Sequence, residues 1–141
     1  MSDAMLRLQG LAKHYGAMPV FSGVDLELRA GEFVAVLGES GVGKSTLLNG
    51  IAGLDTLDAG RVQLAGREVT KMNDDELALL RRREIGFVFQ AFHVLPHLTV
   101  AENVSLPLRL LKRHDAARVD AMLAAVGLAG LRSEEHTSEL Q

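Results

Sequence analysis

GESGVGKST, residues 38–46, is the stretch of this 141-residue sequence that decides its fold class and its chemistry. It matches the pattern G-x-x-x-x-G-K-[ST] of a phosphate-binding loop and directly follows the apolar run FVAVL at residues 33–37. Glycines in such a loop let successive backbone N–H groups point inward at polyphosphate oxygens, and Lys44 is placed to reach the β- and γ-phosphates. Ser45 is expected to ligate Mg²⁺, and the helix expected at residues 45–52 adds its N-terminal amides.

The composition indicates one domain, or a large piece of one, because 48% hydrophobic residues are enough for a single core of ordinary size. The sequence has no cysteine, which excludes disulfides and thiolate metal sites. No apolar segment reaches the roughly 18 residues of a membrane span, and the N-terminus lacks the apolar core of a signal peptide. We therefore expect a cytoplasmic chain. The net charge of −3, without a basic stripe, argues against a nucleic-acid partner.

Alternating and continuous apolar runs predict a mixture of strands and helices. The run at residues 33–37 is expected to be a central strand covered on both faces. Asn73 is a predicted helix cap, Thr99 and Glu102 form a predicted capping box for a helix that Pro107 disturbs, and Asp115 is expected to cap the last helix. The other strands are expected at residues 5–11, 24–29, 61–65 and 85–89.

The order and spacing of three features resemble an ABC transporter ATPase. These are Tyr15, the phosphate-binding loop, and the sequence IGFVFQ at residues 85–90. Residues 89–104 further resemble the branch that serves lipoprotein release, macrolide export and cell division. The resemblance covers residues 5 to about 131 and implies the N-terminal part of an α/β fold, a P-loop NTPase of ABC type. Residues 1–90 would be a portion of the nucleotide-binding core, and residues 91–131 the start of the helical subdomain.

The resemblance also implies roles for individual residues. Tyr15 would stack on the adenine of ATP, and Gln90 would contact Mg²⁺ or the attacking water and link the site to the helical subdomain. By chemistry alone, a lone tyrosine such as Tyr15 is more often a packing residue, and Gln90 could equally well satisfy backbone groups. Lys44 and Gln90 would serve catalysis, and Ser45 and Gln90 would bind the metal. The residues expected to hold the phosphates are Gly38, Ser40, Gly41, Gly43, Lys44, Ser45 and Thr46.

Several parts of the ABC pattern are missing from these 141 residues. The sequence has no serine-glycine-glycine signature, no switch histidine, and no run of four apolar residues followed by Asp-Glu, so no general base is present. Residues 132–141 are polar and share nothing with the family pattern, and we expect them to be a non-native tail. Apolar surface meant for neighbours of residues 33–37 is expected to be exposed. We therefore expect a chain that does not hydrolyse ATP.

The function most consistent with this pattern is that of an ATP-binding subunit that couples ATP hydrolysis to export or lipoprotein release. Its expected partners are a second ATPase subunit and an integral membrane permease. The permease would be contacted through residues 93–104, from His93 to Val104, and would hold the subunit on the inner face of the cell membrane. Two alternatives stay open: a non-transport ABC-type ATPase, and a nucleotide-binding fragment without activity. A metal site at His93 and His97 is not expected, because too few ligands accompany them.

Overall fold

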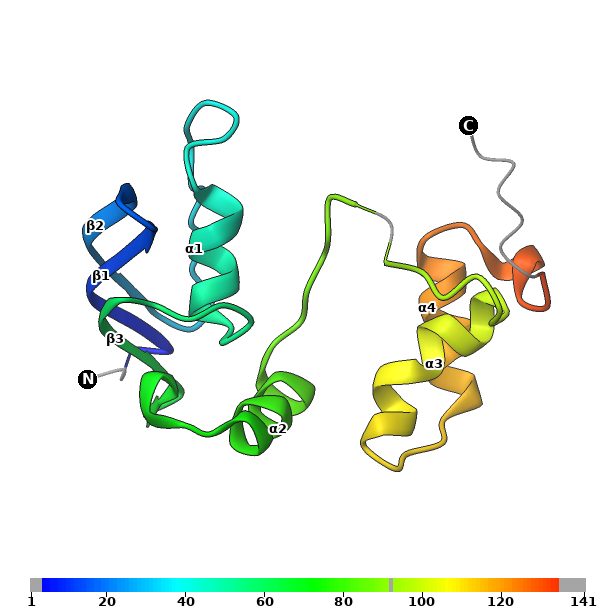
Figure 1. The fold of residues 1–141 in the computed structure, drawn as a ribbon. Helices are drawn as coiled ribbons and strands as arrows, with labels where there is room; N and C mark the ends of the chain where they lie inside the picture. Colours follow the sequence, from blue (N-terminus) through cyan, green and yellow to red (C-terminus); the bar gives the residue numbers. More distant parts are fainter. Residues whose placement is uncertain (1–3, 92, 135–141) are drawn as a thin grey trace. The chain divides into compact units, whose positions relative to one another are not determined.

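The computed structural model describes residues 4–91 and 93–134. It divides into two compact units, Met1–Ile85 and Gly86–Gln141, each of which is described by itself (Figure 1). Of the expected tail at residues 132–141, residues 135–141 lie outside the described part of the chain.

The first unit is built on an antiparallel sheet of four strands in the order β2-β1-β3-β4. Figure 1 labels β1, β2 and β3 of this sheet. The strands are β1 (Leu6–Tyr15), β2 (Met18–Leu28), β3 (Ala59–Leu64) and β4 (Arg67–Glu68). β1 is central, since Leu6 pairs with Leu28 of β2 on one side and with Leu64 of β3 on the other. The strands predicted at residues 5–11, 24–29 and 61–65 are confirmed, although β1 and β2 are longer than alternation alone indicated.

The core of this unit lies where the sheet meets its helices. α1 (Lys44–Ile51) and α2 (Asp74–Glu84) follow the phosphate-binding loop and the short 3₁₀ turn η1 (Val69–Lys71), respectively. Leu47 and Ile51 of α1 and Leu77 of α2 pack against the buried cluster. That cluster consists of Leu8, Leu11, Val62, Val69 and Leu80.

Local capping explains where α2 begins. The Asn73 side chain accepts a hydrogen bond from the Glu76 amide at 3.0 Å, and the Glu76 carboxylate accepts one from the Asn73 amide at 3.0 Å. This reciprocal capping box satisfies two amides that the helix cannot bond internally. Arg81, in the last turn, donates to the Gly53 carbonyl at 2.9 Å. The predicted helix is confirmed, and Arg81 also fastens it to the turn that follows α1.

The second unit contains the helical pair α3 (Val100–Leu110) and α4 (Ala116–Ala125), followed by the short η2 (Ala129–Leu131). The predicted Thr99–Glu102 capping box opens α3, and Pro107 lies inside the helix, which continues to Leu110. The Asp115 side chain caps α4 through the Arg118 amide at 2.9 Å. α4 ends in a Schellman motif, in which the amides of Gly127 and Leu128 donate to the carbonyls of Ala124 and Leu123.

Two predicted strands are wrong. Residues 33–37 and 85–89 form no regular secondary structure. Among residues 4–91 and 93–134, no strand pairs with either segment, and an isolated segment has no ladder of hydrogen bonds to make it a strand. Phe33 and Val88 are correspondingly 92% and 99% exposed. The expected exposure of apolar surface around residues 33–37 is therefore observed.

Gly60 marks a close approach between β3 and β1, and it gives a test of the fold. A Cβ at Gly60 would lie 2.6 Å from the carbonyl oxygens of Gln9 and Gly10, and its φ is +94°. Gly60→Ala should therefore lower the free energy of unfolding by about 3 kcal/mol, from left-handed backbone strain plus overpacking. The measurement is urea denaturation followed by far-UV circular dichroism.

Gly66→Ala is the matched control for this variant. Gly66 has a φ of +76°, but a Cβ there would meet no atom within 4 Å. Only the strain of a left-handed backbone remains, so Gly66→Ala should lower the free energy of unfolding by about 1–2 kcal/mol. Equal losses for the two variants would contradict the close packing of β3 against β1.

Candidate nucleotide-binding site

The phosphate-binding loop leads directly into α1 and leaves the helix N-terminus open. Gly43 is the N-cap residue, in a left-handed conformation with φ 105° and ψ 13°. No side chain among the described residues caps this end, and the first turn of α1 contains no acidic residue. The first amides of a helix have no partner within it, and the helix dipole favours negative charge there. The local structure is thus that of an anion-binding helix terminus.

Lys44 reaches back across the loop. Its ammonium group donates hydrogen bonds to the carbonyl oxygens of Gly38 and Glu39, both at 2.6 Å. These bonds place the lysine charge over the same backbone whose amides are expected to surround the phosphates. Gly38, Ser40 and Gly41 are exposed along the loop, so the loop backbone is open to a ligand.

The β1–β2 hairpin lies against this loop. A Cβ on Gly43 would come within 2.4 Å of the Val20 Cγ1 atom and 3.7 Å of a Phe21 ring carbon. Phe21 pairs with Lys13 across the hairpin, and Tyr15 pairs with Met18 closer to the turn. The sequence positions expected to meet phosphate and base are therefore carried by adjoining parts of one unit.

The residues present fit a magnesium ion that is bound chiefly by nucleotide phosphates. Ser45 is the second residue of α1, and its side chain is exposed; Thr46 follows and is half-buried. A hydroxyl oxygen is a suitable ligand for Mg²⁺, which usually retains water and takes its other ligands from substrate phosphates. No cluster of three or more His, Cys, Asp or Glu side chains that could hold a metal ion occurs in the described part of the chain. Ser45 is thus a protein ligand that suits this ion.

Tyr15 belongs to a polar network that the sequence did not reveal. The Tyr15 residue is 55% exposed, and its hydroxyl donates to the Oδ2 atom of Asp55 at 3.0 Å. Lys13 is buried, donates to the Oδ1 atom of Asp55 at 2.9 Å, and lies 5.0 Å from the centroid of the Tyr15 ring. Lys13 also donates to the Thr56 carbonyl at 2.6 Å. Lys13 and Asp55 are 42 positions apart, so no local pattern could have linked them.

The two charges of this network stabilise each other. The hydrogen bond from Lys13, assisted by those from Tyr15 and the Thr56 amide, holds the pKa of Asp55 below its usual value. The hydrogen bond to Asp55 raises the pKa of Lys13 in turn. Burial opposes both shifts but is outweighed, so Lys13 and Asp55 are ionised together at neutral pH.

Gln90 lies in the second unit, in a bend before Ala91, and its side chain is exposed. The structure therefore groups Tyr15 with the loop in one unit and assigns Gln90 to the other. The catalytic and metal-binding roles expected of Gln90 stay predictions.

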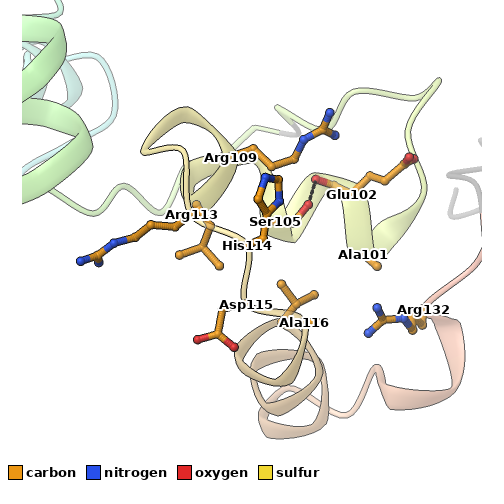
Figure 2. Close-up of a pocket in the computed structure, with 11 residues that line it drawn as sticks. Ala101, Glu102, Ser105, Arg109, Arg113, His114, Asp115, Ala116 and Arg132 are labelled. Carbon is orange, nitrogen blue, oxygen red and sulfur yellow. Dashed lines mark hydrogen bonds between the residues drawn. The ribbon is translucent and has the colours of Figure 1, made fainter.

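A pocket of about 220 Å³ lies between α3 and α4 in the second unit. Its walls carry Arg109, Arg113 and Arg132 together with Glu102 and Asp115 (Figure 2). The three guanidinium groups lie apart from one another, and Arg132 pairs with Asp120. The arginine charges do not converge on a common point, so the pocket has no arrangement suited to polyphosphate.

Comparison with known proteins supports the interpretation of the loop. The family model described as "ABC transporter" matches residues 21–140. The chain is 46% identical to the lipoprotein-releasing system ATP-binding protein LolD of Xanthomonas campestris pv. campestris, over 97% of this chain and 60% of that protein. It is 42% identical to the macrolide export ATP-binding/permease protein MacB of Marinobacter nauticus, over 88% of this chain and 20% of that protein.

Solved structures give the same result for the fold. The chain superimposes with a TM-score of 0.85 and 35% identity on the dimeric, post-hydrolysis ATP-binding cassette MJ0796 bound to ADP and Pi. The match covers 94% of this chain and 62% of that one. The chain therefore spans about three fifths of the length of the LolD relative and of the MJ0796 cassette.

The close approach of Val20 to Gly43 predicts that a side chain at position 43 weakens nucleotide binding. Gly43→Ala should weaken binding of Mg-ATP at least about tenfold, because the left-handed backbone is strained and the new methyl group forces β2 away from the loop. Isothermal titration calorimetry measures the affinity. Val20→Ala, added to Gly43→Ala, removes the colliding methyl groups and should restore part of it. A double variant no better than the single one would contradict the contact between hairpin and loop.

The Lys13–Asp55 pair predicts a dependence of stability on acid. The pKa of Asp55 is lowered in the folded chain. Its contribution to the free energy of unfolding is therefore complete above the usual carboxyl pKa, near 4, and is lost as the pH falls through the lowered value. Urea denaturation at pH 7, 5 and 3.5 should show that acid lowers the free energy of unfolding less in Asp55→Asn than in the unmodified chain. Identical pH profiles would contradict the ion pair.

Proposed function

Because the chain belongs to the ABC transporter family, we propose that it is the nucleotide-binding part of a subunit that couples ATP hydrolysis to export or lipoprotein release. Its similarity to LolD and MacB supports this branch of the family. The observation that carries the proposal is the geometry of the loop: Lys44 lies across a glycine-rich backbone at the uncapped N-terminus of α1.

The proposed chemistry depends on positioning and charge neutralisation. Phosphoryl transfer to water needs little covalent help from the protein, so fixed charges and dipoles provide most of the catalysis. Lys44 and the amides at the start of α1 would hold the β- and γ-phosphates. Mg²⁺, held by Ser45 in this proposal, supplies further charge neutralisation when bound. Tyr15, on the neighbouring hairpin, would stack on the adenine.

The 141 residues by themselves are proposed to bind ATP weakly and not to hydrolyse it. They contain no Asp-Glu pair after an apolar run, so no carboxylate is available as the general base. They also contain no serine-glycine-glycine signature, the element through which the family pattern contacts a nucleotide in the opposite subunit. Hydrolysis would need residues that this chain does not supply.

The proposed partners are a second ATPase subunit and an integral membrane permease. The MJ0796 cassette is described as dimeric, and the MacB relative is named as an ATP-binding/permease protein. No helix in the described part of the chain could cross a membrane. We place the subunit on the inner face of the cell membrane, held there through the permease. The proposed contact is residues 93–104, where Val94 and Leu95 are exposed and His93 stacks on Phe89 with ring centroids 4.2 Å apart.

Substitution of Lys44 tests the proposed function. Lys44→Ala should weaken binding of Mg-ATP by about 10- to 100-fold, the size expected for losing a charge-assisted hydrogen bond. Lys71→Ala is the matched control, because Lys71 is an exposed lysine of the same unit that pairs only with Glu68 among the described residues. The Lys71→Ala variant should bind Mg-ATP with the affinity of the unmodified chain.

Turnover is measured on the same proteins by release of inorganic phosphate. No steady-state release above buffer is expected from the unmodified chain. Release that Lys44→Ala abolishes would refute the proposed inactivity of these 141 residues, and equal affinity in the two lysine variants would refute the phosphate site itself.

A further inference from the structure

The hydroxyl group of Tyr15 is fixed although its ring is open to solvent. An exposed tyrosine beside a hairpin turn normally rotates among several rotamers, and ordering it on binding costs free energy. Here the hydroxyl donates to Asp55 at 3.0 Å while 55% of the residue stays exposed. The ring is therefore held in one orientation, with surface still available for stacking.

Asp55 is itself held by donors other than Tyr15. Its Oδ1 atom accepts hydrogen bonds from the Lys13 ammonium at 2.9 Å and from the Thr56 amide at 2.7 Å. The Lys13 side chain is only 7% exposed and that of Asp55 is 30% exposed, so the ion pair is shielded from water on the lysine side and open in part on the carboxylate side. The Oδ2 atom is the one that accepts from Tyr15. The carboxylate thus connects a buried cation to an exposed aromatic ring.

The backbone of Asp55 is fastened to α1, the helix that starts at the phosphate-binding loop. The amides of Leu54 and Asp55 donate to the carbonyl of Asn49, at 2.8 and 3.3 Å, and the Gly53 amide donates to Gly50 at 3.2 Å. The turn after α1 is therefore closed on the helix itself. As a result, Asp55 keeps a fixed position relative to the loop at the other end of α1.

We propose that Asp55, held in place by Lys13, is a positioning residue that fixes the Tyr15 ring relative to the phosphate-binding loop. One nucleotide can then place its base on the ring and its phosphates in the loop. This inference rests on the proposed function, in which Tyr15 stacks on the base. Asp55 acts through Tyr15 and does not touch the nucleotide. Its loss should weaken binding of a ligand that has a base and leave binding of a bare polyphosphate unchanged.

Calorimetric titration with two ligands separates these effects. Mg-ATP carries the base, and magnesium tripolyphosphate carries only the phosphates. Tyr15→Phe keeps the ring but removes the hydroxyl, and Asp55→Asn removes the charge with little change of shape. Each should bind Mg-ATP about three- to tenfold more weakly than the unmodified chain, the cost of ordering one side chain. Neither should alter tripolyphosphate binding.

A double-mutant cycle tests whether the two residues act as one unit. Both substitutions remove the charge-assisted hydrogen bond from the Tyr15 hydroxyl to the Asp55 carboxylate. The double variant Tyr15→Phe with Asp55→Asn should therefore bind Mg-ATP no more weakly than either single variant. Asp58→Asn is the matched control, since Asp58 accepts from the His14 amide of β1 at 2.6 Å and no hydrogen bond joins it to Tyr15 among the described residues. Its preference for Mg-ATP over tripolyphosphate should equal that of the unmodified chain.

Tyrosine fluorescence reports the hydrogen bond between Tyr15 and Asp55 in the absence of any ligand. Tyr15 is the only tyrosine and the sequence has no tryptophan, so all intrinsic emission comes from this ring. A carboxylate that accepts from the phenol hydroxyl quenches tyrosine emission. Asp55→Asn should therefore emit more strongly than the unmodified chain, and Asp58→Asn should not.

The possible results distinguish this inference from the function on which it rests. A chain that binds neither ligand, or binds both equally, contradicts the proposed base contact and the inference with it. A preference for Mg-ATP that Tyr15→Phe leaves intact overturns the inference alone. Equal weakening of both ligands by Asp55→Asn, or unchanged emission in that variant, assigns Asp55 a structural role only and also overturns it.

Discussion

The contact between Gly43 and Val20 is the constraint on which the rest of the candidate site depends. Only a residue without a side chain can hold the left-handed turn before α1 while β2 packs this closely against it. The same glycine exposes the first amides of α1 to a ligand. One position thus joins the β1–β2 hairpin, which carries Tyr15, to the loop that carries Lys44.

Features set by neighbouring residues could be predicted from the sequence. The loop, the cap of α2 by Asn73 and the cap of α4 by Asp115 each follow from chemistry within a few positions, and the structure contains all three. The extent of β1 and β2 was underestimated, because bulges in their pairing interrupt the strict alternation of apolar residues. Boundaries that depend on cross-strand pairing are not encoded in one strand alone.

Prediction from the sequence was wrong or incomplete where the structure depends on residues that are far apart in the chain. Residues 33–37 have the composition of a buried strand, but a strand also needs a neighbour, and none of the described strands pairs with them. The Lys13–Asp55 pair was missed for a related reason: a lysine in a strand and an aspartate in a turn look like ordinary surface residues until β1 and the end of α1 come together. Both cases concern pairing across the fold, which local periodicity cannot express.

In the proposed site, the start of α1 binds the phosphates of a nucleotide and Tyr15 binds its base. NMR tests both contacts directly, through the changes in amide and aromatic chemical shifts of the 141-residue chain on addition of Mg-ATP. We expect the largest changes at the amides of residues 41–46 and at the Tyr15 ring, and we expect tripolyphosphate to leave the ring unaffected. Changes that are largest elsewhere, or that leave residues 41–46 unmoved, would contradict the proposed site.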